Sequence, residues 1–498
     1  MSWLWLLPLL SVTVGGAAMM VIDSVVPKTK DFAVLGFLSL LLATFTAFAL
    51  WDSGLPSPTW LQPYVANDGM ALLFDMLICG GGALSILIAG DYLGTHKLGR
   101  GEFYVLMMFS IVGAMILARA THALSLFIGL ETMSLGIYAL VAFRRLRRTA
   151  IEAAIKYFFQ GAFASAFLLF GFALLYNATG ELDFARIAMV LQSSEPQLAL
   201  ALIAFVFIFI GLLFKLGITP FHAWVPDAYE GALTPVTATM SVVVKTAAAA
   251  VIMRVLVQVW REFPISDAFT GWPPLAAGLA LVSMLVGNAA ALWQQNIKRL
   301  MAYSSIAHAG YLLLAIAVFP AQGVDALATV PFYVGAYVLG SLAMFGALVA
   351  MGANNYEAVV LDDLRGVGRA HPWVALPWAI GSLSLMGFPP MLGFLAKYYL
   401  FSVALEAGGL YQWVAIAGIF SSCVGAVYYL RLVMVMFQSP VDAQVSDVSD
   451  EKSITATPRL SPLILLALLL ACVALLALGI KPGLFLEYSR SAVTSLVP

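Results

Sequence analysis

Charged residues are scarce in this sequence. Only 10% of its 498 residues are Asp, Glu, Lys or Arg, whereas soluble globular proteins contain about 25%, and 62% of them are hydrophobic. This balance excludes a disordered chain and an ordinary soluble enzyme, and the formal net charge of −1 provides no basic excess for a nucleic-acid partner. It leaves a protein that crosses a membrane many times.

Cysteine and histidine are too few and too scattered to predict a metal site. The three cysteines, Cys79, Cys423 and Cys472, all lie inside apolar runs, which favours neither a disulfide framework nor a cysteine ligand set. The five histidines also lack the spacing of metal ligands. They are His96, His122, His222, His308 and His371. We therefore expect no metal in this chain.

Long apolar runs, by contrast, are abundant. A transmembrane helix needs about 20 apolar residues, and runs of this kind favour helices over the shorter, alternating strands of a β-barrel. The segments are approximately 3–22, 32–51, 70–90, 103–119, 121–142, 153–178, 198–219, 233–260, 274–293, 300–319, 328–352, 373–407, 411–437 and 460–480. The first run lacks a positively charged leader and is interpreted as a span, not a cleaved signal. We predict an all-α membrane protein with about 14 transmembrane helices.

Basic residues in the connecting loops indicate the orientation. Loops after odd-numbered spans hold fifteen Lys and Arg residues, whereas loops after even-numbered spans hold only Arg119, Arg186 and Arg261. The fifteen are Lys28, Lys30, Lys97, Arg100, Arg144, Arg145, Arg147, Arg148, Lys298, Arg299, Arg365, Arg369, Arg431, Lys452 and Arg459. Because basic loops remain in the cytoplasm, both termini are predicted to be periplasmic and the polar stretch 438–459 to be a cytoplasmic loop.

A few charged residues remain inside the spans. They are Lys156, Lys215, Lys245, Arg254 and Lys397, with Glu131 as the matching acid. Each costs roughly 2.5–3.5 kcal/mol at the bilayer centre, so a protein that carries several is expected to use them, most often as an ion or proton path. Burial disfavours the charged form of a lysine and a nearby carboxylate favours it. Glu131 and Lys215, on the fifth and seventh spans, are therefore candidates for a switchable pair.

Structural roles are the alternative for each of these charges. Lys156 follows Glu152 by four residues, so the two can form an ion pair along one helix. Arg254, Asp75 and Glu406 lie near span ends, and we expect them to reach toward water or cap a helix. For the deeper charges the alternative is a static salt bridge that holds helices together.

The seventh and twelfth spans contain helix breakers. Gly-x-(Thr/Pro)-Pro occurs at 217–220 and again at 387–390, near Lys215 and Lys397. Because proline removes a helix hydrogen bond and clashes with the preceding turn, both spans are predicted to be discontinuous. Five spans separate the two copies, so the second is inverted, an arrangement typical of transport sites. His222 and His308 lie beside a break or a charge and are candidate proton carriers.

Six segments also resemble a known family. They are LSLFIGLETMSLGIYALVAFRR with Glu131, EAAIKYFFQGAFASAFLLFG with Lys156, FKLGITPFHAWVPDAYEGALTPVTA with Lys215 and His222, KTAAAA with Lys245, NIKRLMAYSSIAHAGYLLL with His308, and GFPPMLGFLAKYYLF with Lys397. In this order they resemble the antiporter-like membrane subunits of proton-pumping NADH–quinone oxidoreductase, respiratory complex I, over roughly residues 70–435. Within that family the resemblance is strongest to subunit N, because of the Lys156 segment and because Lys397 is a lysine where the M subunits have a glutamate.

The resemblance implies a fold and a set of residue roles. The fold has two inverted five-helix repeats, which divides the chain into helices 1–3 (1–102), a first repeat (103–260), a second repeat (261–437), and the cytoplasmic loop with helix 14 (438–498). The implied roles all concern a proton relay. Glu131 and Lys215 would form the coupling pair, Lys245 the central relay, Lys397 the group facing the exit, His222 and His308 polar links, and Lys156 an additional buried lysine.

The resemblance also implies what lies outside this chain. NADH, FMN, iron–sulfur clusters and quinone would bind other subunits, in keeping with the lack of a GxGxxG motif after a predicted strand and of cysteine ligands. Its partners would be an antiporter-like neighbour and small membrane subunits in the bacterial inner membrane. Two alternatives share the Glu and Lys pattern: a subunit of a multi-subunit Mrp-type cation/proton antiporter and one of an energy-converting hydrogenase. A scaffold with inert buried pairs is the third.

Overall fold

The structure is a computed structural model that describes residues 3–25, 32–51, 53, 59–96, 98–99, 101–192, 197–261, 271–352, 357–439 and 461–497. Its N-terminal half forms η1 (Leu4–Leu6), α1 (Leu7–Val25), α2 (Phe32–Ala49), α3 (Gly69–Thr95), α4 (Gly101–Arg119), α5 (Ala123–Val141), α6 (Arg148–Thr179), α7 (Phe184–Gln192), α8 (Leu198–Leu216), α9 (Trp224–Gly231), α10 (Thr234–Thr239), η2 (Met240–Val244) and α11 (Lys245–Gln258). The C-terminal half forms α12 (Trp272–Leu292), α13 (Ile297–Ala317), α14 (Phe319–Gln322), α15 (Val324–Met351), η4 (Leu361–Leu364), α16 (Val367–Ala370), α17 (Pro372–Met386), α18 (Leu392–Glu406), α19 (Gly409–Met436), α20 (Pro462–Ile480) and α21 (Gly483–Thr494).

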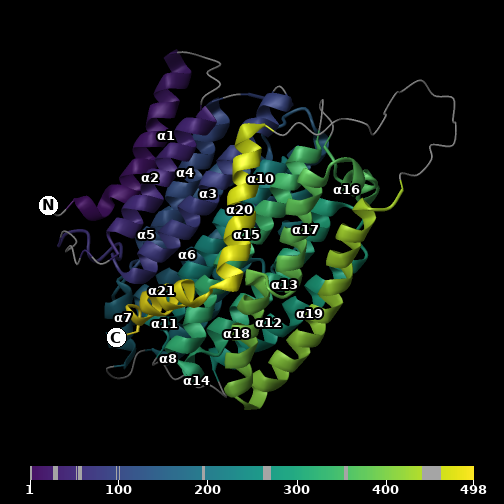
Figure 1. Ribbon diagram of the computed structural model, residues 1–498. Helices are drawn as coiled ribbons and strands as arrows, with labels where there is room; N and C mark the ends of the chain where they lie inside the picture. The colour runs from purple at the N-terminus through teal and green to yellow at the C-terminus, as the bar shows by residue number, and fades with distance from the viewer. Residues whose placement is uncertain are drawn as a thin grey trace.

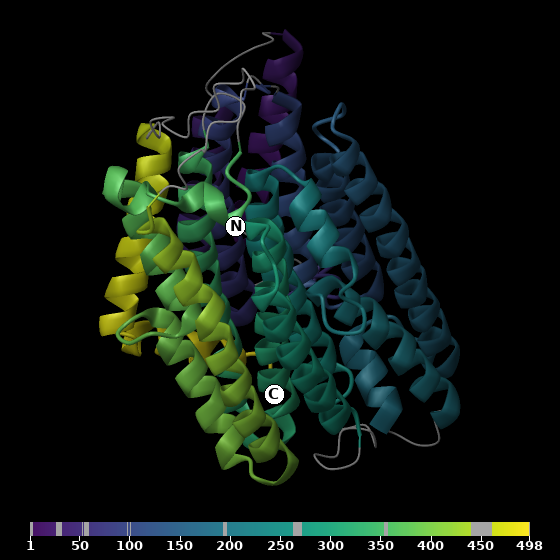
Figure 2. The same ribbon diagram turned by 90° about the vertical axis from the view of Figure 1, so that its right-hand side faces the viewer.

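The long helices stand side by side in one bundle (Figure 1). Turned by 90°, the blue helices around α6 lie at one edge, the yellow α20 and the yellow-green α19 lie toward the other, and the teal and green helices lie between them (Figure 2). The short α21 instead lies across the bundle beside the lower end of α20 (Figure 1). The central helices are the most enclosed. In the most apolar 18-residue stretch of each helix, 100% of residues are buried in 234–258 and 94% in α13, against 33% in α2.

The helices coincide with the predicted spans. Within the described residues, thirteen are long and apolar enough to cross a membrane, and the remaining predicted span, 373–407, is divided between α17 and α18. The predicted loop 438–459 lies outside the described residues from 440 onward. So do six of the residues used for the orientation, namely Lys28, Lys30, Lys97, Arg100, Lys452 and Arg459.

The two predicted helix breaks are present, and their geometry is the same. α8 ends at Gly217, whose φ of 80° needs a glycine, and its N–H donates to the carbonyls of Leu213 and Phe214. α17 ends in the same way at Gly387, with φ 92° and with bonds to the carbonyls at positions 383 and 384. The chain resumes as α9 after the first break and as α18 after the second. Each predicted break therefore falls at a helix end capped by a glycine.

A second pair of matching features lies at the starts of α5 and α13. His122 caps α5 and forms a β-bridge with Asp183, while Asn296 caps α13 and forms one with Val360. In each case the first residue of the helix donates to the carbonyl of the residue before the bridge partner: Ala123 N to Leu182 O at 3.0 Å, and Ile297 N to Val359 O at 2.7 Å. Each bridge ties a helix start to the loop that follows the next long helix.

Candidate functional site

Lys245 lies where three helical segments join without interruption. α10 runs into the π-helical turn η2, and η2 runs into α11, whose first residue is this lysine. A π-helical turn is rare and is often found at functional sites. The Lys245 side chain is buried, its ammonium donates to the backbone carbonyl and the hydroxyl of Ser305 on α13, and it lies 5.3 Å from the ring centre of Tyr337. A hydroxyl, a carbonyl and an aromatic ring thus replace its water shell.

Further hydroxyl groups extend from these partners. The Tyr229 hydroxyl on α9 is 3.3 Å from Ser305 Oγ, and the Tyr337 hydroxyl is 2.8 Å from Ser241 Oγ in η2. Ser305 therefore contacts Lys245 on one side and Tyr229 on the other. The hydroxyls near the lysine thus form two hydrogen-bonded groups, Ser305 with Tyr229 and Tyr337 with Ser241, and each hydroxyl can both donate and accept.

Lys397 lies in the second turn of α18, directly after the break in that span. Its ammonium donates to the Met386 carbonyl at 2.9 Å and to Ser422 Oγ at 2.8 Å, and it lies 5.4 Å from the ring centre of Tyr311. The Met386 carbonyl has no helix partner, because the residue four positions later is Pro390. The broken helix therefore creates an acceptor for the lysine.

A small cavity joins Lys397 to the centre of the bundle. Its lining includes Lys397, His308, Tyr333 and Tyr337. His308 has a hydrogen bond at each ring nitrogen, to the Tyr333 hydroxyl at 2.6 Å and to the Tyr429 hydroxyl at 3.2 Å. Since Tyr337 lines this cavity and also faces Lys245, the two lysines are linked through one wall of aromatic side chains and His308.

Lys215 is buried at the end of α8, next to α5. Its ammonium donates to Ser134 Oγ at 2.8 Å and to the Tyr138 hydroxyl at 3.1 Å. Glu131 is one turn before Ser134 on α5, but no ion pair within 4.0 Å joins it to Lys215 in the described part of the chain, and its Oε1 atom is buried without a hydrogen-bond partner. Lys215 therefore binds α5 beyond Glu131 and forms no ion pair with that carboxylate.

We call Glu131, Lys215, Lys245, His308 and Lys397, together with the serine and tyrosine side chains around them, the row. Two predicted site residues lie outside it. Lys156 is 45% exposed in this chain and pairs with Glu152 at 2.7 Å and with Asp227 at 3.1 Å, so the expectation of a buried lysine is wrong for the chain by itself. The local pair with Glu152 is confirmed. His222 lies in the turn between α8 and α9, partly exposed, and its Nδ1 atom has no hydrogen-bond partner among the described residues.

Arg254 and Asp75 differ from expectation, because neither reaches water. Arg254 is 0% exposed and donates to both carboxylate oxygens of Asp68, at 2.7 and 2.9 Å. Asp75 is equally buried and accepts two hydrogen bonds from Arg119, which lies at the end of α4. Both charges are neutralised by a partner on another helix, so the prediction of snorkelling is wrong for both.

Several residues of the row were not among the predicted site residues. Ser305, Tyr229, Tyr337, Ser134 and Tyr138 are of types that occur throughout transmembrane helices. Only Ser134 and Tyr138 could have been found, because they lie three and seven positions after Glu131 and so share its helix face. The others depend on which helices become neighbours.

Comparison with known proteins identifies the family of this chain. Residues 120–425 match the family described as "NADH:quinone oxidoreductase/Mrp antiporter, TM". The chain is 41% identical to NADH-quinone oxidoreductase subunit N 1 of Sorangium cellulosum, with 98% of this chain and 97% of that protein aligned. This chain belongs to the subunit N family of NADH-quinone oxidoreductase.

Solved structures place the subunit N fold in a wider group. A chain of respiratory complex I from Thermus thermophilus with bound aureothin is 34% identical, with a TM-score of 0.79 over 97% of this chain and 100% of that one. A chain of the Mrp complex from Dietzia sp. has a TM-score of 0.82 over 100% of this chain and 98% of that one, but only 21% identity. The second likeness shows the fold alone.

Subunit N is an all-helical, multi-pass membrane subunit of NADH-quinone oxidoreductase, in a family of antiporter-like proton-translocating proteins whose cofactors reside in other subunits. Within the part of the chain that the structure describes, no group of three or more His, Cys, Asp or Glu side chains is placed to hold a metal ion.

Proposed function

We propose that this chain conducts protons across the membrane, along a buried row coupled to quinone reduction elsewhere in complex I. One observation carries the proposal: each of three lysines is held by neutral groups, and of these Lys215 and Lys245 are buried and Lys397 is partly buried. Lys215 donates to two hydroxyls, Lys245 to a hydroxyl and a carbonyl, and Lys397 to a carbonyl and a hydroxyl. In the described residues none of the three forms an ion pair within 4.0 Å.

Neutral partners suit a group that must gain and lose a proton. A lysine paired with a buried carboxylate cannot be deprotonated without leaving the carboxylate charged and unpaired in a low-dielectric interior, which costs several kcal/mol. A lysine held by hydroxyls and carbonyls has no such anion beside it. Because a hydroxyl can donate as well as accept, it serves both the ammonium and the neutral amine.

The residues of the row then take distinct roles. Lys245 is the central relay, and Tyr337, His308 and the small cavity link it to Lys397, the group on the exit side. Glu131 lies one turn before Ser134, the residue that binds Lys215. A change in the charge of this carboxylate therefore changes how readily Lys215 holds its proton. His222 and Lys156 flank the row, and Lys156 connects to the central helices through Asp227, which also pairs with Arg299 on α13 at 2.8 Å.

The proposed architecture has fourteen crossings, with α17 and α18 together forming one of them. It contains two inverted five-helix repeats, in residues 103–260 and 261–437. The matching glycine-terminated breaks after α8 and α17 support this division, as do the matching β-bridges before α5 and α13. The basic loops support cytoplasmic odd-numbered loops and periplasmic termini in a bacterial inner membrane.

The proposed partners are an antiporter-like neighbour and small membrane subunits of complex I. Energy from NADH oxidation and quinone reduction would reach Glu131 through these subunits. The exposed side chains of α6, which include Phe159, Phe163 and Phe170, form an apolar surface that a helix of a partner or lipid can cover.

Replacing Lys245 by Ala in the assembled complex tests the proposal. Proton pumping and NADH–quinone turnover should both fall about tenfold or more, because one relay group is removed. NADH oxidation by a soluble artificial acceptor should persist, since that reaction does not use the membrane subunits. Normal assembly with unchanged pumping would refute the relay role of Lys245.

A further inference from the structure

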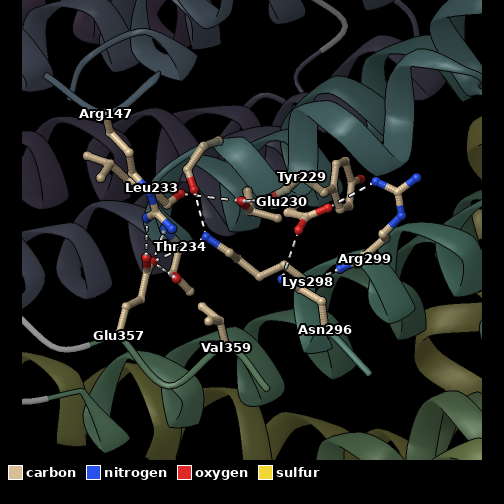
Figure 3. Close-up of polar contacts among 12 residues, drawn as sticks. Arg147, Tyr229, Glu230, Leu233, Thr234, Asn296, Lys298, Arg299, Glu357 and Val359 are labelled. Carbon is tan, nitrogen blue, oxygen red and sulfur yellow. Dashed lines mark hydrogen bonds and ion pairs between the residues drawn. The ribbon is translucent and has the colours of Figure 1, made fainter. Parts of the chain in front are cut away.

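A buried carboxylate joins the two halves of the bundle at one end. Glu357 lies in the segment after α15, and its Oε1 atom accepts from the Thr234 backbone N–H at 3.1 Å, from the Thr234 hydroxyl, and from Lys298 at 3.4 Å (Figure 3). Its Oε2 atom is 3.3 Å from an Arg147 nitrogen. Arg147 and Thr234 belong to the N-terminal half, whereas Lys298 and Glu357 belong to the C-terminal half, so this one side chain bridges both.

Other polar contacts continue this seam between the halves. Lys298 also donates to the Ala232 carbonyl at 2.8 Å. Asn296 donates to Glu230 at 3.2 Å, and Arg299 pairs with the same glutamate at 2.9 Å (Figure 3). All of these contacts join the start of α13 to α9 or to the turn that follows it. We call the set of residues 147, 230, 232, 234, 296, 298, 299 and 357 the seam.

The seam lies at the start of the two helices that meet at Lys245. Thr234 is the first residue of α10, which continues through η2 to Lys245 about 16 Å along the helix axis. Lys298 is the second residue of α13, which carries Ser305 about 10 Å further along. Because helices are stiff over such lengths, the relative position of their starts determines whether the Lys245 ammonium meets Ser305.

Glu357 is a fixed charge in this arrangement. Burial opposes its ionisation, but Lys298, Thr234 and Arg147 outweigh that effect, and the pKa of its carboxyl falls from 4.5 to about 2. The carboxylate therefore stays ionised at any physiological pH and does not itself relay protons.

We propose that Glu357 is a positioning residue for Lys245: by holding the start of α10 against α13, it sets the contact between the Lys245 ammonium and Ser305. This inference rests on the proposed function, since it assumes that Lys245 relays protons. Glu357 lies outside the row, so its effect on Lys245 passes through helices α10 and α13.

A charge-removing variant and a charge-keeping variant test the positioning role. Glu357→Gln removes the charge that holds both cations, and NADH–quinone turnover per assembled complex should fall about fivefold. Glu357→Asp keeps the charge on a side chain one methylene shorter and should restore at least about half of the turnover. Asp362→Asn is the matched control, because Asp362 lies in the same connection, is 74% exposed and pairs only with Arg365 among the contacts described; it should leave turnover unchanged.

A double-mutant cycle with Ser305→Ala decides whether the effect passes through Lys245. If Glu357 acts by placing Lys245 on Ser305, Glu357→Gln should lower turnover by less than about 1.5-fold once the Ser305 hydroxyl is gone. An undiminished fivefold loss in the Ser305→Ala background would overturn the inference. If the Glu357→Gln complex does not assemble, Thr234→Val, which removes only the hydroxyl donor, replaces it in the same cycle with the same two outcomes.

The two hypotheses fail separately. Wild-type pumping in Lys245→Ala would remove the relay itself, and with it the proposed function. Impaired pumping in Lys245→Ala, together with independent effects of the Glu357 and Ser305 variants, would overturn the positioning role alone.

Discussion

The lysines of the central row and the cations near the helix ends differ in what neutralises them. Lys245 and Lys397 face hydroxyls, carbonyls and aromatic rings. Arg119 and Arg254 face carboxylates, and both guanidinium side chains are buried, with Arg254 0% and Arg119 1% exposed. The partners differ between the two regions: they are neutral groups for the lysines and carboxylates for the arginines.

That difference distinguishes charges held in an ion pair from charges that have only neutral partners. A buried pair of opposite charges is neutral as a unit, and each member penalises a change in the other. Such pairs hold helices in place: Arg254 connects α11 to the start of α3, and Arg119 connects α4 to Asp75 within α3. A lone buried cation with neutral partners can instead lose its proton, which is what a relay needs.

The largest effect is expected where a fixed pair is broken. Asp75→Ala leaves the Arg119 guanidinium buried and unpaired, which should destabilise the chain by roughly 3–5 kcal/mol. The measurement is the amount of this chain retained in the purified complex. The double variant Asp75→Ala/Arg119→Met removes both charges and should restore most of it; if it assembles no better than the single variant, the pair is not what holds α3 and α4 together.

Acid should weaken the seam through Glu357. Its folded pKa of about 2 lies below the usual 4.5, so the stabilisation is complete above about pH 4.5 and is lost as the pH falls toward 2. The loss amounts to at most roughly 3 kcal/mol. Thermal dissociation of this chain from the detergent-solubilised complex, followed from about pH 6 to about pH 3, should show a smaller pH dependence in Glu357→Gln. An identical dependence in that variant would assign the acid sensitivity to other groups.

Lys245→Arg distinguishes a mobile charge from a fixed one. Arginine keeps the positive charge but does not release its proton in proteins. We expect proton pumping to fall about tenfold or more while assembly stays normal, as for Lys245→Ala. Pumping near the wild-type rate would show that Lys245 only supplies a charge.

Glu131→Gln tests the link between the row and the rest of the complex. The change removes a charge one turn from the group that binds Lys215, so coupled NADH–quinone turnover should slow about threefold. Oxidation of NADH by an artificial acceptor should be unaffected. Equal loss of both activities would indicate an assembly defect instead.

The smallest effect is expected at an exposed pair. Asp362 is 74% exposed, and its ion pair with Arg365 is local, spanning three residues. Asp362→Asn should change the stability of the chain by less than about 0.5 kcal/mol, because solvent screens such pairs. A thermal dissociation temperature shifted as far as in Asp75→Ala would contradict the role given to burial.

Sequence reasoning located the spans well, because a segment that crosses a membrane must be long and apolar, and it singled out the lysines of the row from the cost of placing charge in hydrocarbon. It also located the two breaks, since glycine and proline act within one helical turn. It failed for Arg254, whose partner Asp68 lies 186 residues away, and for Lys156, whose position at the rim of the chain depends on how α6 is rotated. It also brought Glu131 and Lys215 together as a pair, whereas the lysine binds the hydroxyls of Ser134 and Tyr138, one and two turns further along α5.

By itself, then, the sequence determined that this chain is a polytopic helical membrane protein, where its helices break, and which of its charges fall inside apolar helices. Those properties depend on local composition and on the solvent that surrounds each segment. Only the tertiary structure decided which buried charges face carboxylates and which face hydroxyls. That choice depends on helix rotation and on contacts between helices that are distant in the sequence, such as the one between Arg254 and Asp68, which are 186 residues apart.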